Sequence, residues 1–309
     1  MRLVTFRSAG GARVGVVDGD EVIDLAGAAP DLPHDMASLL AAGPDAMQTA
    51  RAALTRREAP RRPLASLSLA APVLRPPKFL AIGLNYGAHV AESGAARPEV
   101  PLFFNKQSTC VVGPFDEVQV PAASSLVDYE GELAFVIARR CRHVPATRAS
   151  EVIGGYMVVN DVSVRDWQFR SPTMTMGKSF DTHGPTGPWL VTPDELGDPH
   201  GLRLRTWVNG ELRQDATTDD LIFDCFAMVE HLTTAFTLEP GDVVATGTPA
   251  GVGMAMTPPR YLTAGDSVRI DIEGIGAIEN SVVSEPATTP TGLDPQLATT
   301  DASTAVSSS

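Results

Sequence analysis

Short apolar runs separated by turn residues dominate the start of the chain. RLVTF, RVGVV and EVIDL lie on either side of Gly10-Gly11 and Asp18-Gly19, and such pairs are typical of the tight turns between antiparallel strands. From Asp35 to about Glu58 the apolar residues recur at helical spacing, with a break at Gly43-Pro44. This pattern predicts a small β meander followed by two short helices.

A proline-dense stretch, APRRPLASLSLAAPVLRPP, comes next, and its apolar residues follow neither the spacing of a helix nor that of a strand for long. We interpret it as a linker, so residues 1–76 are predicted to form a small N-terminal α+β domain with its linker. From residue 77 to 284 brief apolar strands alternate with Gly and Pro turns, as in KFLAIGL, PLFF, EVQVP, ELAFVIA, GYMVVNDV, WLVT, LRLRTWVNG, DVVATG and SVRIDIE. The predicted fold is therefore a mixed, β-rich α+β fold.

One long helix is expected inside the β-rich part. LIFDCFAMVEHLTTAF, residues 221–236, has one apolar face and precedes a Pro-Gly turn, so we expect it to pack across the sheet. Residues 285–309 contain mainly Thr, Ser, Pro and Ala. Such a segment buries too little apolar surface to offset its ordering entropy, and we predict a disordered tail.

Charge and cysteine usage restrict the partners. The formal net charge is -13, which repels a phosphate backbone and argues against a nucleic-acid partner. The chain has three cysteines without a zinc or redox spacing, which favours a reduced cytoplasmic protein. No apolar run reaches membrane-spanning length, so no membrane partner is expected.

The sharpest chemical signal is SLVDYEGELAFVIARR, in which Glu130 and Glu132 are two residues apart at the mouth of an apolar strand. Their side chains share one face, and a cation between them would relieve their repulsion. Asp161, at the end of another apolar run, can supply a third oxygen ligand. Oxygen-only ligands favour Mg²⁺ or Mn²⁺, with Ca²⁺ as an alternative. The competing interpretation is a solvated strand edge.

Two further segments carry groups with catalytic chemistry. In AIGLNYGAHVAES, His89 and Glu92 are three residues apart, so on a helical turn the carboxylate can orient the ring and make it a general base. In TMTMGKSFDTHGPTGPW, Lys178 lies in a tight loop from which it can neutralise a ligand carboxylate or an oxyanion. A surface His/Glu pair and a solvated turn lysine are the alternatives. The loop VVATGTPAGVG places Thr248 where backbone N–H groups can hold an anion.

Together and in this order, these segments resemble the fumarylacetoacetate hydrolase superfamily. The resemblance rests on FLAIGLNYGAHVAE, LVDYEGELAFVI, VVNDVSVRDWQ, GKSFDTHGPTGP, ATGTPAGVG and PPRYLTAGDSV, and it extends from Pro77 to about Val283. It implies a β-roll catalytic domain over residues 77–284, preceded by a small N-terminal domain. It also implies a homodimer.

The resemblance assigns roles residue by residue. Glu130, Glu132 and Asp161 become ligands of Mg²⁺ or Mn²⁺, and His89 and Glu92 a water-activating pair on a segment that closes over substrate. Lys178 becomes the lysine at the metal site. Thr248, Arg165 and Gln168 are expected to bind substrate.

The implied reaction is hydrolysis of a carbon–carbon bond in a small acidic 1,3-diketone or acylpyruvate-type 2-oxo acid, through a metal-bound enolate. Decarboxylation or isomerisation at a similar site, of the oxaloacetate or 5-carboxymethyl-2-hydroxymuconate-pathway type, is the alternative, and a catalytically silent binding homologue is the alternative from another class. The His/Glu pair favours hydrolysis, because decarboxylation needs no water-activating base. Substrate specificity is expected from Phe103, Phe104, Gln107, Trp167 and Tyr261.

Overall fold

The computed structural model describes residues 1–287 of the 309-residue chain. The tail predicted for residues 285–309 lies almost wholly outside that range, so its disorder stays a prediction. Within the described range, no helix is both long and apolar enough to cross a membrane.

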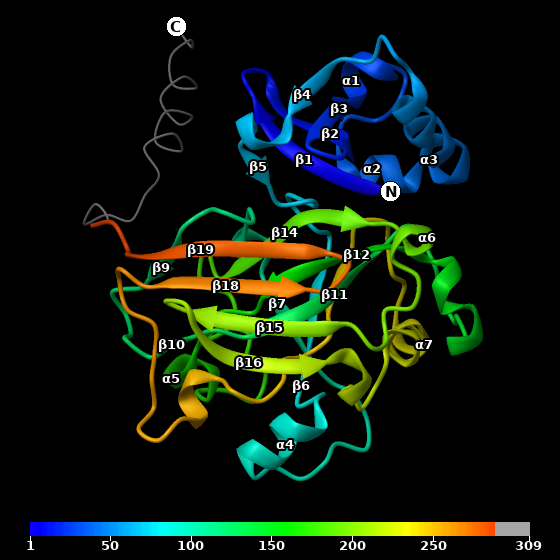
Figure 1. Ribbon diagram of the computed structural model, residues 1–309. Helices are drawn as coiled ribbons and strands as arrows, with labels where there is room; N and C mark the ends of the chain where they lie inside the picture. Colours follow the sequence, from blue (N-terminus) through cyan, green and yellow to red (C-terminus); the bar gives the residue numbers. More distant parts are fainter. Residues whose placement is uncertain (288–309) are drawn as a thin grey trace, which may run out of the picture.

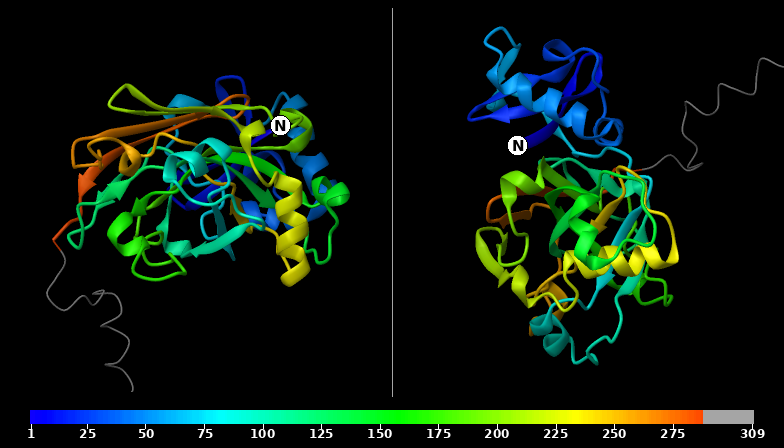
Figure 2. Two further views of the ribbon diagram at one scale, coloured as in Figure 1. Left: turned by 90° about the horizontal axis from the view of Figure 1, so that it is seen from below. Right: turned by 90° about the vertical axis from the view of Figure 1, so that its right-hand side faces the viewer.

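The N-terminal part, residues 1–76, lies at one end of the molecule and contains the predicted meander and both predicted helices (Figures 1 and 2). The side chain of Asp35 caps the helix that begins at Met36 by accepting a hydrogen bond from the Ser38 N–H at 2.9 Å. Gly43, with φ 82°, separates this helix from the next one. A positive φ suits glycine because it has no Cβ. The elements are β1 (Arg2–Ser8), β2 (Gly11–Asp18), β3 (Glu21–Asp24), α1 (Leu25–Ala28), α2 (Met36–Ala41), α3 (Gly43–Ala52), β4 (Arg61–Pro63) and β5 (Leu69–Ala70). The short helix α1 and the strands β4 and β5 were not predicted; the two strands lie within the predicted linker and pair with the meander.

One large sheet runs through both parts of the chain, in the order β4-β3-β2-β1-β14-β12-β11-β17-β6-β7. Strand β1 pairs with β14, with Arg2 opposite Val191, so the boundary predicted near residue 77 does not interrupt the sheet. The later strands of this sheet are β6 (Phe79–Gly83), β7 (Leu102–Lys106), β11 (Gly131–Ile137), β12 (Ile153–Asn160), β14 (Gly184–Val191) and β17 (Val243–Ala245), and β8 (Val111–Val112) pairs with β14.

A second sheet, in the order β16-β15-β18-β19-β9, packs against the first. Its strands are β9 (Val118–Val120), β15 (Arg203–Val208), β16 (Glu211–Thr217), β18 (Ser267–Ile272) and β19 (Gly276–Ser284), and β10 (Val127–Asp128) pairs separately with β13 (Ser163–Val164). The sequence patterns did not predict β16 or β19. Both strands carry polar residues at many positions, so their apolar alternation is weak.

Strands β11 and β12 are buried on both faces. Leu133 and Phe135 belong to the apolar cluster between the two sheets. Ala134 and Val136 belong to the cluster beneath α2 and α3. Because side chains alternate along a strand, Glu132 lies on the same face as Ala134 and Val136.

Four short or isolated helices complete the β-rich part: α4 (Gly87–Ser93), α5 (Arg165–Gln168), α6 (Pro193–Leu196) and α7 (Cys225–Ala235). The helix predicted for residues 221–236 is α7, and its predicted start was wrong by four residues. The Asp224 side chain accepts hydrogen bonds from the Phe226 and Ala227 N–H groups at 2.9 and 2.7 Å, and such an N-cap fixes the first turn. As predicted, α7 packs on the core between the sheets, through Met228 and Leu232.

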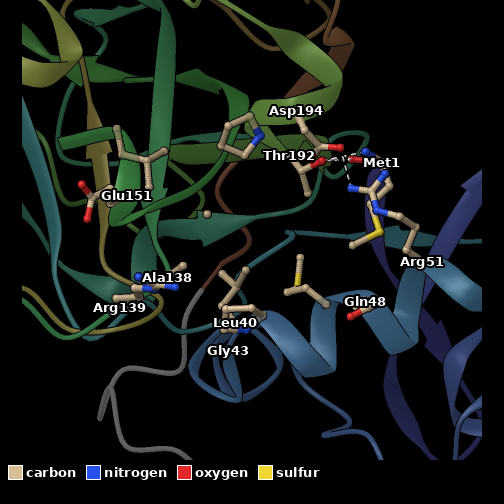
Figure 3. A pocket seen from close by; sticks show the side chains of 15 residues that line it. Met1, Leu40, Gly43, Gln48, Arg51, Ala138, Arg139, Glu151, Thr192 and Asp194 are labelled. Carbon is tan, nitrogen blue, oxygen red and sulfur yellow. Dashed lines mark hydrogen bonds and ion pairs between the residues drawn. The ribbon is translucent and has the colours of Figure 1, made fainter. Parts of the chain in front are cut away.

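A cavity of about 350 Å³ separates α3 from the start of β12 and from α6 (Figure 3). Arg51 reaches across it to Asp194 at 2.5 Å, and Leu40 and Met47 line its apolar side. None of the predicted site residues lines this cavity. It is a gap between the two parts of the chain, and the candidate chemistry lies elsewhere.

Candidate active site

The three carboxylates predicted as metal ligands lie together at the ends of two adjacent strands. Glu132 belongs to β11 and pairs with Val159 of β12, and the Asp161 N–H donates to the Glu130 carbonyl oxygen at 2.8 Å. This register puts all three side chains on one face. One ligand oxygen from each lies within 4.8 Å of the others, and each residue is at most 5% exposed.

Three cationic side chains surround this carboxylate cluster. Lys178 Nζ donates to Glu130 Oε2 at 2.5 Å and to Asp161 Oδ2 at 2.8 Å. Lys106 Nζ donates to Asp161 Oδ1 at 2.7 Å and to the Lys178 carbonyl oxygen. Arg165 Nη1 donates to Glu130 Oε1 at 2.6 Å. Both oxygens of Glu130 and of Asp161 are therefore held in place.

Glu132 is the carboxylate without a cationic partner in this cluster. Its Oε2 accepts a hydrogen bond from the Gly247 N–H at 2.8 Å. Burial, followed by the charges of Asp161 and Glu130, raises the pKa of Glu132 well above its ordinary value. Burial also acts to raise the pKa of Glu130, but the charges of Lys178 and Arg165 together outweigh it, so the pKa of Glu130 is lowered.

A divalent cation fits this arrangement. The cluster offers three buried oxygen donors without His or Cys, which is the donor set of Mg²⁺ and Mn²⁺. Lys178, Lys106 and Arg165 only balance the carboxylates that they contact, and Glu132 remains a carboxylate whose charge burial opposes. A cation at the cluster would remove that cost.

The His89–Glu92 pair forms on α4, at the end of the molecule opposite the N-terminal part (Figure 1). His89 Nδ1 lies 3.1 Å from Glu92 Oε2. The Gly251 N–H donates to Glu92 Oε1 at 2.9 Å and to Oε2 at 3.2 Å. Asp220 holds the start of the helix by accepting from the Ala88 N–H at 3.0 Å. Glu92 is thus fixed by a loop far away in sequence, and it can orient the ring of His89.

These groups share one cavity of about 300 Å³. Seven of the nine predicted site residues line it: His89, Glu130, Glu132, Arg165, Gln168, Lys178 and Thr248. The other two contact lining residues without lining the cavity themselves, Glu92 through His89 and Asp161 through Lys178. The structure therefore brings the whole predicted set together.

Comparison with known proteins identifies the family. Residues 78–283 match the model of the fumarylacetoacetate (FAA) hydrolase C-terminal domain. The mitochondrial oxaloacetate tautomerase of Xenopus laevis is 42% identical over 289 residues, which cover 92% of this chain and 90% of that protein. The chain belongs to the fumarylacetoacetate hydrolase family.

Solved structures of this family are similar along most of the chain. Maleylpyruvate hydrolase from Sphingobium sp. SYK-6, in complex with manganese(II) and pyruvate, is 37% identical with a TM-score of 0.77, covering 93% of this chain and 100% of that one. A 5-carboxymethyl-2-hydroxymuconate delta-isomerase from Mycobacterium smegmatis is 38% identical with a TM-score of 0.75, covering 92% and 100%.

Members of the fumarylacetoacetate hydrolase family are metal-dependent hydrolases, isomerases or tautomerases. The predicted family and the predicted sheet-rich α+β fold are confirmed. The homodimer and the cytoplasmic location stay predictions, and the tautomerase relative is mitochondrial.

Arg165, predicted to bind substrate, is held by a residue that the sequence analysis missed. Asp128 Oδ2 accepts hydrogen bonds from Arg165 Nε at 2.9 Å and Nη2 at 2.8 Å. Arg165 Nη1 donates to Glu130 and to Gln168 Oε1. Asp128 is two residues before Glu130, so the pattern D-x-E-x-E already placed it on the same face. That extended pattern was the signal available in the sequence.

The predicted substrate-binding hydroxyl of Thr248 is also engaged. It accepts from Gln214 Nε2 at 2.8 Å and donates to the Gly131 carbonyl oxygen at 3.1 Å. Gln214 lies on β16, which the sequence patterns did not predict. Among the five residues expected to set specificity, Phe104 lines the cavity, and the cavity lining does not include Phe103, Gln107, Trp167 or Tyr261. Phe103 points to the opposite face of β7, because neighbours on a strand alternate.

The loop that carries Lys178 is tied to a buried neutral histidine. Gly177 passes so close to α5 that a Cβ there would lie 2.2 Å from the Gln168 nitrogen. Further along the loop, His183 Nε2 lies 2.8 Å from the Gln119 carbonyl oxygen. Burial lowers the pKa of His183 from 6.5 to about 4. The folded protein therefore favours the uncharged ring.

This pKa predicts acid sensitivity. A histidine whose pKa is lowered by folding stabilises the protein fully above its unfolded pKa, and this stability is lost as the pH falls from 6.5 towards 4. Relative to His183→Gln, the free energy of unfolding of the parent protein should fall by up to about 3 kcal/mol in that pH range. Urea unfolding between pH 7 and 4 measures this, with exposed His34→Gln as the control. Equal losses in the parent and in His183→Gln would contradict the assignment.

Proposed function

We propose that the chain is a divalent-metal-dependent enzyme that hydrolyses a carbon–carbon bond in a small acylpyruvate-type 2-oxo acid. One observation carries the proposal: the oriented histidine His89 and the buried carboxylates Glu130 and Glu132 line the same cavity. A general base and a site for an oxygen-liganded cation are the two parts that this hydrolysis requires.

Glu130, Glu132 and Asp161 would hold Mg²⁺ or Mn²⁺. A bound cation supplies Lewis acidity, which stabilises negative charge on the oxygens of a 2-oxo acid. The structural neighbour that contains manganese(II) and pyruvate supports both the cation and the substrate class. Lys178, beside Glu130 and Asp161, adds a fixed positive charge at the same end of the cavity.

His89 is proposed to move the proton. With the Glu92 carboxylate at Nδ1, the ring proton is held on Nδ1, and Nε2 is left as the acceptor. Nε2 takes a proton from water, and the hydroxide adds to the distal carbonyl carbon. The bond between that carbon and C3 of the 2-oxo acid then breaks. The proton returns to C3, and the products are a carboxylic acid and pyruvate.

Tautomerisation of oxaloacetate is the second candidate. It is favoured by the 42% identity to the tautomerase of Xenopus laevis. The His89–Glu92 pair can move a proton between C3 and the enol oxygen of oxaloacetate without adding water. Both reactions pass through an enolate of a 2-oxo acid, so the two candidates differ in the fate of that enolate.

Product analysis with chelator-treated protein tests the proposal. The protein is supplied with Mg²⁺ or Mn²⁺ and given acetylpyruvate or oxaloacetate. Formation of acetate and pyruvate from acetylpyruvate supports hydrolysis. Ketonisation of enol-oxaloacetate with no acetylpyruvate cleavage moves the function to a tautomerase, and release of CO₂ from oxaloacetate moves it to a decarboxylase. No metal-dependent turnover of either compound contradicts the proposal.

His89→Gln is expected to lower kcat about 10²- to 10⁴-fold, because the variant keeps the volume of the side chain but loses the base. Mn²⁺ binding should be unchanged, since His89 is not among the three carboxylate ligands. Steady-state kinetics and titration calorimetry measure the two effects, with His34→Gln as the control. Full activity in His89→Gln would remove the histidine from the mechanism.

A further inference from the structure

The active-site cavity has two chemically different walls. One wall carries the carboxylate cluster with Lys178, Arg165 and His89. The other, the apolar wall, consists of Ile82, Leu84, Leu102 and Phe169. Phe104 and Met174 lie where the two walls meet, because Lys178 Nζ is 5.0 Å from the centre of the Phe104 ring and the Met174 sulfur accepts from Gln168 Nε2. The side chains of the apolar wall carry no charge. A ligand that reaches both walls therefore finds an ionic partner at the carboxylate wall and not at the apolar wall.

The cations that line the cavity are already paired at the carboxylate wall. Arg165 donates through Nε, Nη1 and Nη2 to Asp128, Glu130 and Gln168. Lys178 donates to Glu130 and Asp161. His89 pairs with Glu92. Within residues 1–287, no further Lys, Arg or His lines the cavity.

The apolar wall is only partly covered. Phe169 is 66% exposed and Leu102 is 40% exposed, although both line the cavity. Exposed aromatic and aliphatic side chains gathered at the rim of a site are typical of ligand contacts. Removing each methylene of a ligand from water favours binding by about fourfold. A hydrocarbon chain would bury this rim, whereas a second carboxylate there would lose water without gaining a cationic partner.

We propose that the substrate is a monocarboxylic 2-oxo acid whose distal acyl group is an apolar chain, and that Leu102 and Phe169 select it. The inference rests on the proposed function, because the 2-oxo acid end must lie at the carboxylate cluster. It goes further by ranking substrates that end in a second carboxylate, such as oxaloacetate, below this class, so preferred turnover of oxaloacetate would contradict it. Leu102 and Phe169 are specificity residues here, and the proton transfer stays with His89.

Ligand binding tests this without requiring turnover. Calorimetry with the Mn²⁺-loaded protein compares pyruvate, 2-oxohexanoate and 2-oxoadipate, of which the last two differ only in a terminal methyl or carboxylate. We expect 2-oxohexanoate to bind more than tenfold more tightly than pyruvate, and 2-oxoadipate to bind no more tightly than pyruvate. If pyruvate binds and 2-oxoadipate binds more tightly than 2-oxohexanoate, the inference is overturned. If none of the three binds, the proposed function fails and the inference fails with it.

A charge substitution at the rim gives the second readout. Leu102→Lys places an ammonium group at the apolar wall and should shift the preference towards 2-oxoadipate by at least tenfold relative to 2-oxohexanoate. Leu74→Lys is the matched control, since Leu74 is 42% exposed and does not line the cavity. Where acylpyruvates are cleaved, hexanoylpyruvate and succinylpyruvate should show the same reversal in kcat/KM. An unchanged ratio in Leu102→Lys would contradict the role of this wall.

Discussion

Glu132→Gln is expected to abolish Mn²⁺ binding and to lower turnover by ~10³-fold or more, while the metal-free protein stays at least as stable as the parent. A metal acting as a Lewis acid contributes several kcal/mol to the transition state, and each 1.4 kcal/mol is a factor of about ten in rate. The substitution keeps the shape of the side chain and can still accept from the Gly247 N–H. It removes the one carboxylate of the cluster whose ionisation is opposed by burial and by its neighbours.

The pH dependence of stability separates this explanation from simple misfolding. The pKa of Glu132 is raised in the folded state, so its contribution to stability is fully present below its unfolded pKa and is lost as the pH rises through the folded pKa. In the presence of a chelator, the parent protein should therefore lose stability with rising pH more steeply than Glu132→Gln. Urea unfolding at several pH values measures the difference.

The matched control for this variant is Glu117→Gln, which changes an exposed glutamate and should leave metal binding, turnover and the pH profile unchanged. Retained Mn²⁺ binding in Glu132→Gln would show that the cation binds elsewhere. A metal-free variant much less stable than the parent would show that Glu132 has a structural role beyond the cluster.

The sequence predicted the carboxylate cluster well because its geometry is local. Glu130 and Glu132 share a face by strand alternation, and Asp161 ends the strand that pairs directly with β11. The prediction needed only that two apolar runs form neighbouring strands. Strands β1 to β3 and helices α2 and α3 were predicted for the same reason, since each depends on periodicity and turns within a few residues.

The partners of the cluster could not be predicted in the same way. Lys106 contacts Asp161, which is 55 positions away in sequence. It is the last residue of β7, whereas the predicted strand PLFF ends at Phe104. Gln214 holds Thr248 from a strand whose alternation is masked by polar residues. These contacts depend on which strands become neighbours in space, and no local period carries that information. The late start of α7 is different, because the cap that sets it, Asp224, is visible in the sequence.

Asp128→Asn is expected to destabilise the protein by about 3–5 kcal/mol, because it breaks a buried ion pair and leaves the guanidinium of Arg165 with Glu130 as its remaining carboxylate partner. Asp128 is fully buried and accepts hydrogen bonds from two nitrogens of Arg165 and from the Gly253 and Met254 N–H groups at 2.8 and 2.9 Å. An amide has one oxygen, so its NH₂ group must face at least one of these donors. Urea unfolding measures the loss.

A double-variant cycle shows whether the pair itself carries the effect. Arg165→Gln should also destabilise the protein, because it leaves the Asp128 carboxylate buried without its cation. Asp128→Asn/Arg165→Gln should lose less stability than the two single variants added together, since neither charge is then left unpaired. Asp215→Asn, which breaks the exposed pair with Arg203, should cause a much smaller loss. Additive single losses would mean that the cost comes from the backbone donors of Gly253 and Met254, and that Arg165 is positioned mainly by Glu130.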